Sequence, residues 1–572
     1  MLRSQQIREI AAEMDSLKMG AGWKSEDLAK AQIMVQTSWG DSHPGSVHLG
    51  KLAEEIKYGV AEKGGKPAQY TITDICDGIA QGHDGMNYSL VSRELIAGAI
   101  EAQINAAPFD GAVFSASCDK AIPAHLMAIA RKNIPSIFVP GGVMKAGPDN
   151  LTLEQIGTYY AKFLRNEISK EKYDYYKANA CPGCGACQFM GTAATMQVLS
   201  EALGMALPGS ALMPADNNGL YEMAKEAGKQ ILRLVETNLT PNKIMTSGAF
   251  KNAIMVHAAI SGSTNALLHL PAIAHELGIV LEADLFDEIH REIPYIVNVR
   301  PSGSLPAEYF WYAGGTAAVM EQIKAYLDLD VITVTGKTLG DNLEELKTND
   351  YYRMCDRYLK AGGIRREQVI ADFDTPIKKH GAVAILKGNL APEGAVVKHS
   401  TVVEKMHQVV CTAKPFNSEE EAYNAVIEKR IKPGDAVFIR YEGPKGSGMP
   451  EMFYTTEAIV SDPELASTVA LITDGRFSGA SKGPAIGHVS PEAFEEGPIA
   501  LVEVGDLIKI DIPRRTLDII GVKGERKTPR EIEQILNERS KKYIMPEIKK
   551  KRGILKIYSK LAVSAFKGAY ME

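Results

Sequence analysis

Residues 111–117 read GAVFSAS and residues 134–142 read IPSIFVPGG, two short apolar runs that are separated by a helix-like segment. A further segment with helical character, LTLEQIGTYYAKFLRNEIS, follows at 151–169. Buried runs of four to eight residues that alternate with helices are typical of parallel strands in an α/β layered fold. The alternation runs from residue 85 to about 345. We therefore predict an α/β domain with a parallel sheet over residues 1–380.

The pattern changes near residue 380. Five β-rich runs follow, separated by Gly, Pro and Asp turns and with few helical segments between them. They are GAVAILKGN (381–389), GAVVKHS (394–400), DAVFIRYEG (435–443), STVALITDG (467–475) and DLIKIDIPRRTLDIIG (506–521). We predict a second, β-barrel-like domain over 381–572. Its C-terminal tail, which includes EIKKKRGILKIYSKLAVSAF at 547–566, reads as a basic helix with a solvated face.

The composition of the chain limits the kinds of partner that it is expected to bind. The chain has 572 residues and a net charge of 64 − 70 = −6, which is too weak and of the wrong sign for a nucleic-acid surface. No apolar run approaches the roughly 20 residues of a membrane-spanning helix. The first segment, MLRSQQIREIAAEMDSL, reads as an amphipathic helix rather than a signal peptide. We expect a cytoplasmic protein with a small-molecule substrate and with neither a membrane nor a nucleic-acid partner.

The cysteines point to a metal or an iron–sulfur cluster. There are seven in the chain, too few for a disulfide framework, and three fall within CPGCGAC at 181–187. Overlapping C-x-x-C steps favour a metal or an iron–sulfur cluster. A structural zinc site that also uses Cys118 is the alternative, although zinc ribbons usually have two separated pairs.

Two loops of the N-terminal domain carry groups for metal chemistry. In DGIAQGHDGM (77–86) the glycines suit an irregular loop that presents Asp77 or Asp84 to a hard cation, or a turn whose aspartate caps a helix. The run Ser117-Cys-Asp-Lys120 comes directly after a predicted strand, where ligands of α/β sheets usually lie. Its thiol suits iron and its carboxylate suits magnesium, unless the run holds only a buried cysteine and a surface ion pair.

Two glycine-rich segments follow predicted strands of the second domain, YEGPKGSGMPE (441–451) and TDGRFSG (473–479). Their backbone N–H groups are able to hold a carboxylate. The sequence shows no His–Asp pattern that would make Ser478 part of a hydrolase triad. A serine close to a divalent ion can instead lose its proton and act as a base.

Taken together, these motifs resemble the dihydroxy-acid dehydratase/6-phosphogluconate dehydratase family, which includes sugar-acid dehydratases. The likeness extends over nearly the whole chain, and several long motifs in one order are far more specific than any single pattern. The motifs are HPGSVHL (43–49), DGIAQGHDGMNYSLVSRELIA (77–97), CDKAIPAHLMA (118–128), GACQFMGTAATM (185–196), SGSTNALLHL (261–270), RYEGPKGSGMPEM (440–452), TDGRFSG (473–479) and GHVSPEA (487–493).

The resemblance implies roles for particular residues. Cys118 and Cys187 would bind an iron–sulfur cluster, and Ser478 would abstract the substrate proton. Magnesium would be bound by four side chains, the last of them as an N6-carboxylated lysine: Asp77, Asp119, Glu451 and Lys120. The resemblance also implies an α/β N-terminal domain, a β-barrel-like C-terminal domain and assembly as a homodimer or homotetramer.

One departure from the family pattern concerns the cluster. Members with a two-iron cluster have a cysteine where this chain has Gly45, within HPGSVHL. Either the third thiolate comes from elsewhere, with Cys184 or Cys181 as the substitute, or the cluster differs. The branch with glycine here is associated with a four-iron cluster, so [4Fe-4S] is favoured over [2Fe-2S].

The expected reaction is dehydration of a 2,3-dihydroxy acid to a 2-keto acid. The segments GRFSG, GHVSPEA and KRGILKIYSKLAVSAFKGA (551–569) favour the members that serve valine and isoleucine biosynthesis. PAHLMA at 123–128 is closer to the sugar-acid members, which remain the alternative. A non-enzymatic iron–sulfur sensor is a remote third reading, because it leaves Asp77, Glu451 and the TDGRFSG segment unexplained.

Overall fold

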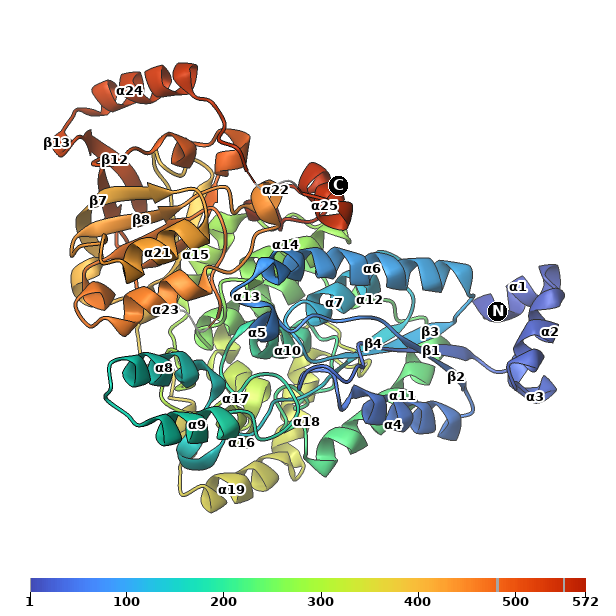
Figure 1. The fold of residues 1–572 in the computed structure, drawn as a ribbon. Helices are drawn as coiled ribbons and strands as arrows, with labels where there is room; N and C mark the ends of the chain where they lie inside the picture. Colours follow the sequence, from blue (N-terminus) through green and yellow to red (C-terminus); the bar gives the residue numbers. More distant parts are fainter. Residues whose placement is uncertain (1, 480–482, 549–550) are drawn as a thin grey trace.

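The computed structural model describes residues 2–479, 483–548 and 551–572, which contain two β-sheets (Figure 1). All neighbouring strands of the N-terminal sheet are parallel, as predicted. Its strands, in spatial order, are β2 (Lys66–Thr71), β1 (Gln32–Thr37), β3 (Gly111–Ala116) and β4 (Ser136–Pro140). The last two are the strands expected at 111–117 and 134–142. The first two lie before residue 85, where no strand was expected.

Helices cover both faces of this sheet. On one face, α4 (Leu49–Glu62) packs against α11 (Asn218–Thr237), and both contact the strands. On the other face, α7 (Ala121–Lys132) contacts β3 and β4, and α6 (Ser89–Ala106) packs on α7. The α4–α11 contact requires glycine, because a Cβ atom at Gly59 would lie 2.0 Å from the carbonyl oxygen of Lys225.

Residues 141–370 form helices and contribute no further strand to either sheet among the residues described, so the alternation expected up to about 345 is wrong there. Besides α11, the longer helices of this part are α8 (Ile156–Leu164), α9 (Lys170–Asn179), α10 (Thr192–Ala202), α13 (Ser247–Ala259), α14 (Ala266–His275), α15 (Ala283–Glu292), α17 (Gly315–Gln322), α18 (Leu339–Thr348) and α19 (Tyr351–Ala361). Of these, α10 and α14 pack on α7, and α15 packs on β5 (Val383–Leu386), the strand of the second sheet that comes first in the chain.

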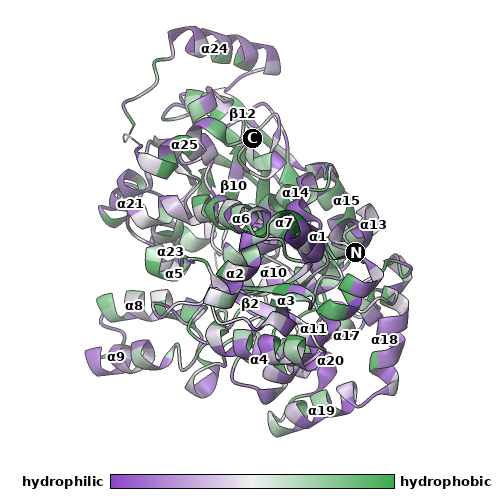
Figure 2. Cartoon of the chain, turned by 90° about the vertical axis from the view of Figure 1, so that its right-hand side faces the viewer, coloured by the Kyte–Doolittle hydropathy of each residue, from purple (hydrophilic) through white to green (hydrophobic). Residues whose placement is uncertain are grey.

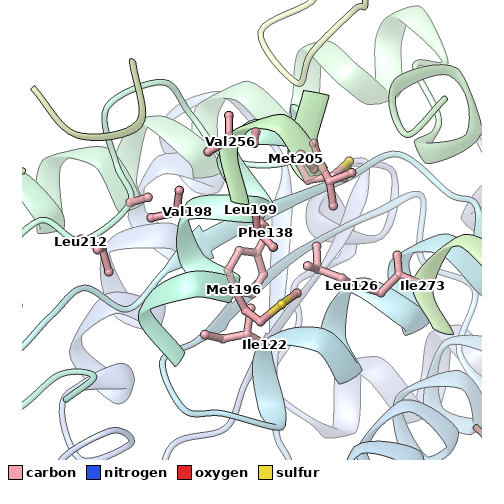
Figure 3. Packing of buried hydrophobic residues seen from close by; sticks show 14 of the residues in the cluster. Ile122, Leu126, Phe138, Met196, Val198, Leu199, Met205, Leu212, Val256 and Ile273 are labelled. Atoms are coloured by element: carbon pink, nitrogen blue, oxygen red, sulfur yellow. The ribbon is translucent and has the colours of Figure 1, made fainter. Parts of the chain in front are cut away.

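The main hydrophobic core lies between these helices and the parallel sheet (Figure 3). Ile122 and Leu126 of α7, Phe138 of β4 and Met196 of α10 are at most 1% exposed. Every residue of α10 is buried. This core fixes the start of α10 relative to the end of β3, which matters for the site below.

The C-terminal sheet has nine strands and is mixed and curled, in agreement with the predicted barrel-like domain. Strands β7 to β10 are parallel neighbours, and the outer strands are antiparallel. In spatial order the strands are β13 (Glu525–Arg526), β12 (Thr516–Val522), β11 (Leu507–Asp511), β7 (Gln408–Phe416), β8 (Asp435–Ile439), β9 (Ala470–Thr473), β10 (Ala485–Ser490), β6 (Gly394–Lys398) and β5 (Val383–Leu386). Helices α21 (Glu419–Ile427) and α23 (Phe453–Ser461) pack against each other beside it.

Both ends of the chain are helical. The expected N-terminal helix is divided into α1 (Arg3–Ile10) and α2 (Glu13–Gly20). In the tail, α24 (Pro529–Lys542) and α25 (Gly553–Leu561) are helical, and residues 549–550 of the predicted basic helix lie outside the described residues. Strongly hydrophilic helices such as α18 lie at the periphery (Figure 2). Within the ranges described, no helix combines the length and apolarity needed to cross a bilayer.

Candidate active site

The candidate site lies where loops leave the carboxyl ends of parallel strands. Because β1, β2 and β3 are parallel neighbours, the loops that follow them start at the same edge of the N-terminal sheet. These loops contain residues 38–48, 72–77 and 117–120. In the second sheet, β8 and β9 are also parallel neighbours, and the segments 440–451 and 474–479 follow them. Both sheets therefore contribute loops of the kind that hold ligands.

Loops of the second sheet meet the starts of helices in the N-terminal half. A Cβ atom at Gly479, next to Ser478, would lie 2.6 Å from the Cα atom of Gly191, directly before α10. The Asn265 side-chain amide, at the start of α14, donates to Glu451 Oε1 at 3.2 Å. The site is thus built from both halves of the chain.

Three of the predicted magnesium ligands are brought together. One carboxylate oxygen from each of Asp77, Asp119 and Glu451 lies within 4.8 Å of the other two. These residues are far apart in sequence and come from three different loops. A group of three carboxylates is the oxygen-rich donor set that Mg²⁺ prefers, so these residues are able to hold a hard cation.

Two buried cations balance part of this negative charge. Lys120 Nζ donates to Asp77 Oδ2 at 2.9 Å, and Arg476 donates to Glu451 and, at 3.4 Å, to Asp77. Burial alone would raise the pKa of Asp77, but Lys120, Arg476 and the Ser89 hydroxyl lower it below the ordinary value. Asp77 is therefore ionised. Lys120 Nζ thus lies beside the predicted magnesium ligands, and the N6-carboxylation of Lys120 stays a prediction.

Asp119 differs electrostatically from Asp77. Its Oδ1 accepts the backbone N–H of Ala193 at 3.0 Å, in the first turn of α10. Burial, followed by the negative charge of Asp77, raises the pKa of Asp119 to about 7, although Lys120 acts in the opposite direction. A carboxyl group of this kind is easily deprotonated by a cation, and that supports its place in a metal site.

A second group of metal-ligand type consists of softer donors. A ring nitrogen of His43 and the sulfur atoms of Cys76 and Cys118 lie within 4.8 Å of one another. Within the described part of the chain, His43 Nδ1 is buried and has no hydrogen-bond partner. Thiolates and imidazole are ligands for iron, so this group fits a cluster of the kind expected. Cys118 was predicted here, whereas His43 and Cys76 were not.

The cysteines of CPGCGAC are placed differently from one another. Burial, and after it the neighbouring Asp119, Cys76 and Cys181, raise the pKa of the Cys187 thiol, which places Cys187 near the second group. Cys184 packs against the main core, with Asp216 and Lys51 as its nearest charges. Its assignment as the third cluster ligand stays a prediction that this placement does not favour. Cys181 is exposed.

Ser478 lines a pocket between the domains. The pocket also includes Thr264, Lys398 and His488. In the part of the chain described, neither Lys398 Nζ nor His488 Nε2 has a hydrogen-bond partner, although both atoms are buried. Ser478 follows Arg476 by two residues, so the serine expected to act as a base lies on the loop that also supplies the arginine of the carboxylate group.

The buried amine of Lys398 yields a stability prediction. Burial lowers the pKa of Lys398 to about 7, whereas an unfolded lysine keeps a pKa of about 10.4. Between these pH values the unfolded chain therefore binds one more proton than the native protein. The free energy of unfolding consequently decreases as the pH falls from about 10 to about 7. We expect Lys398→Met to stabilise the protein by a few kcal/mol at pH ~7 and hardly at pH ~10, since one pKa unit is worth about 1.4 kcal/mol.

Thermal unfolding of both proteins at these two pH values measures the difference. An equal effect of Lys398→Met at both values would show that the amine is not desolvated in the native state.

Sequence reasoning missed four residues of the site: His43, Cys76, Asn265 and Arg476. Arg476 lies within the TDGRFSG motif but received no role. Cys76 directly precedes Asp77. Had a strand been predicted at 66–71, the loop after it would have placed Cys76 beside Cys118. The signal was therefore present for Cys76, but it depended on a strand that was not recognised.

Comparison with known proteins agrees with this architecture. Residues 30–342 match the dihydroxy-acid/6-phosphogluconate dehydratase N-terminal family model, and residues 368–569 match the C-terminal model of the same family. Similar proteins include the dihydroxy-acid dehydratases of Caldicellulosiruptor saccharolyticus, 43% identical over 98% of both chains, and of Methanosarcina barkeri, 42% identical over the full length of both. The chain therefore belongs to the dihydroxy-acid/6-phosphogluconate dehydratase family.

Proposed function

We propose that this protein is a hydro-lyase that converts a 2,3-dihydroxy carboxylic acid into a 2-keto acid, with dihydroxy-acid dehydration in valine and isoleucine biosynthesis as its role. One observation carries the proposal. Cys76-Asp77 and Cys118-Asp119 are adjacent pairs, and each pair places its thiol in the soft donor group and its carboxylate in the hard donor group. Two metal centres of different chemistry would therefore lie side by side, as required to act on neighbouring carbons of one substrate.

The donor sets decide which cofactor belongs to which group. Asp77, Asp119 and Glu451 would hold Mg²⁺, and Cys118 and Cys187 would hold an iron–sulfur cluster, for which we favour [4Fe-4S] over [2Fe-2S]. The orphaned His43 Nδ1 beside Cys118 supports a soft metal there, because a buried ring nitrogen normally has a partner. When bound, these groups supply the Lewis acidity that makes hydroxide a better leaving group and the proton at C2 more acidic.

The side chains around the two groups orient the substrate and move the proton. Lys120 and Arg476 bring two positive charges to the three carboxylates, which limits repulsion of an anionic substrate. Ser478 would take the proton from C2, while the hydroxyl at C3 leaves and completes the loss of one water molecule. The enol that remains becomes the ketone by proton transfer from solvent.

The deciding test is a substrate comparison with anaerobically prepared enzyme. We expect the kcat/KM for 2,3-dihydroxyisovalerate to exceed that for every member of a panel of aldonates. A higher value for an aldonate would favour the sugar-acid alternative, for which PAHLMA at 123–128 is the supporting observation. Absence of keto-acid formation from either class, with both metals bound, would contradict the proposed reaction. Assembly as a homodimer or homotetramer and a cytoplasmic location are part of the same proposal.

A further inference from the structure

We propose that Cys76 is the third thiolate ligand of the iron–sulfur cluster and takes over the role that Gly45 cannot perform. The inference rests on the proposed function, which supplies the cluster. It assigns a new role, because Cys76 lies outside both the CPGCGAC run and the loop that contains Gly45.

The first argument is proximity. The sulfur atoms of Cys76 and Cys118 and a ring nitrogen of His43 lie within 4.8 Å of one another. The Cys76 residue is partly exposed, whereas Cys118 and His43 are buried. Cys76 is thus the most exposed residue of the three.

The second argument comes from the space around Gly45. A Cβ atom at Gly45 would lie 3.3 Å from both Cys118 Sγ and His43 Nδ1. A side chain at position 45 would therefore point into the same group of donors. With glycine there, the group lacks a thiol from the loop after β1, and Cys76 supplies one from the loop after the neighbouring strand β2.

The third argument is the unpartnered nitrogen. His43 Nδ1 is buried beside these sulfur atoms and, among the described residues, accepts and donates no hydrogen bond. A buried polar atom without a partner calls for an explanation, and a bound ion is one of them. Because two thiol sulfur atoms lie within 4.8 Å of a His43 ring nitrogen, a metal bound by these three residues supplies that explanation here.

The two cysteines that sequence analysis favoured are placed less well. Cys184 packs against the main core, and the charges that act on it are Asp216 and Lys51. Cys181 is exposed. Neither belongs to a group of metal-ligand type among the described residues.

The test compares cluster content among single variants purified anaerobically and reconstituted with iron and sulfide. Cys76→Ser should lose iron, acid-labile sulfide and the visible charge-transfer absorbance as completely as Cys118→Ser. Cys184→Ser and Cys355→Ser should keep a wild-type content, the latter as a matched control because Cys355 is buried in α19, away from both donor groups. A Cys76→Ser variant that keeps the full iron and sulfide content would overturn the proposal.

A second measurement uses the wild-type protein and avoids any effect of substitution on folding. Cysteine alkylation, read by mass spectrometry, is compared between the reconstituted protein and the same protein stripped by a chelator. We expect Cys76 to be protected in the reconstituted form and labelled in the stripped form, with exposed Cys181 labelled in both. Equal labelling of Cys76 in both forms would overturn the proposal, whereas failure of the wild type to take up any cluster would contradict the proposed cofactor instead.

Discussion

Ser478→Ala should leave the fold and both metal centres intact, yet lose turnover by a factor of ~10²–10⁴, the range typical of a positioned base. A free serine hydroxyl is far too weakly acidic to act as a base near neutral pH. It can do so only where positive charge stabilises the alkoxide. The loop of Ser478 lies against the start of α10, and the Ala193 N–H of α10 donates to Asp119. The start of α10 therefore positions both the serine and the carboxylate group.

The measurement that isolates this role is exchange of the substrate C2 proton with solvent deuterium. We expect exchange to stop in Ser478→Ala and to continue in Ser467→Ala, a control in the same domain whose hydroxyl is bonded to nearby backbone carbonyls and to Lys405. Normal exchange in Ser478→Ala would assign the base to another residue. His83 would be tested next, although its ring already accepts the N–H of Gly85 and contacts the carbonyl of Ile79.

The fold could be predicted from sequence where a strand is buried on both faces. Strands β3 and β4 are short apolar runs that lie in the sheet as expected. Strand β2 was missed for a physical reason: it is an edge strand that includes Pro67, and its residues KPAQYT are only partly buried. Edge strands tolerate proline and polar residues, so they read as loops.

The region after β4 was predicted wrongly for the opposite reason: helices such as α10 are deeply buried there, whereas β2 is partly exposed. AIMVHAAI at 253–260 is an apolar run within and just after α13, and every residue of α10 is buried. A helix buried on all sides has no polar face and therefore no amphipathic period. Short apolar runs of this kind cannot be told from strands by pattern alone, and the expected alternation was therefore extended to about residue 345.

The sequence predicted the carboxylates of the site, but not the ion pairs that they form. Asp77, Asp119 and Glu451 came from motifs and do lie together, but their ion pairs with Lys120 and Arg476 depend on contacts between loops of two sheets. No sequence spacing encodes such contacts. The missed β2 had a direct consequence, since Cys76 reaches Cys118 only because the loops after β2 and β3 start at one edge of the same sheet.

Asp119→Asn should abolish turnover while the cluster absorbance stays close to that of the wild type, because it replaces a negatively charged magnesium ligand by a neutral amide and leaves the iron ligands unchanged. Asparagine is a more specific substitution than alanine, because it changes fewer contacts. Its amide oxygen can still accept the Ala193 N–H that Asp119 Oδ1 accepts at 3.0 Å, so the start of α10 keeps its support. What the substitution removes is the negative charge within the three-carboxylate group.

The matched control is Asp84→Asn, since Asp84 is an exposed acid of the segment that contains Asp77 but does not belong to the carboxylate group. Magnesium titration by calorimetry should show weakened binding in Asp119→Asn alone, and iron and sulfide content should be equal in both variants. Near-normal turnover of Asp119→Asn at saturating magnesium would remove Asp119 from the metal site. Loss of iron from Asp119→Asn would mean instead that the two centres do not form independently, because Asp119 adjoins Cys118 in the chain and a shift of one would then displace the other.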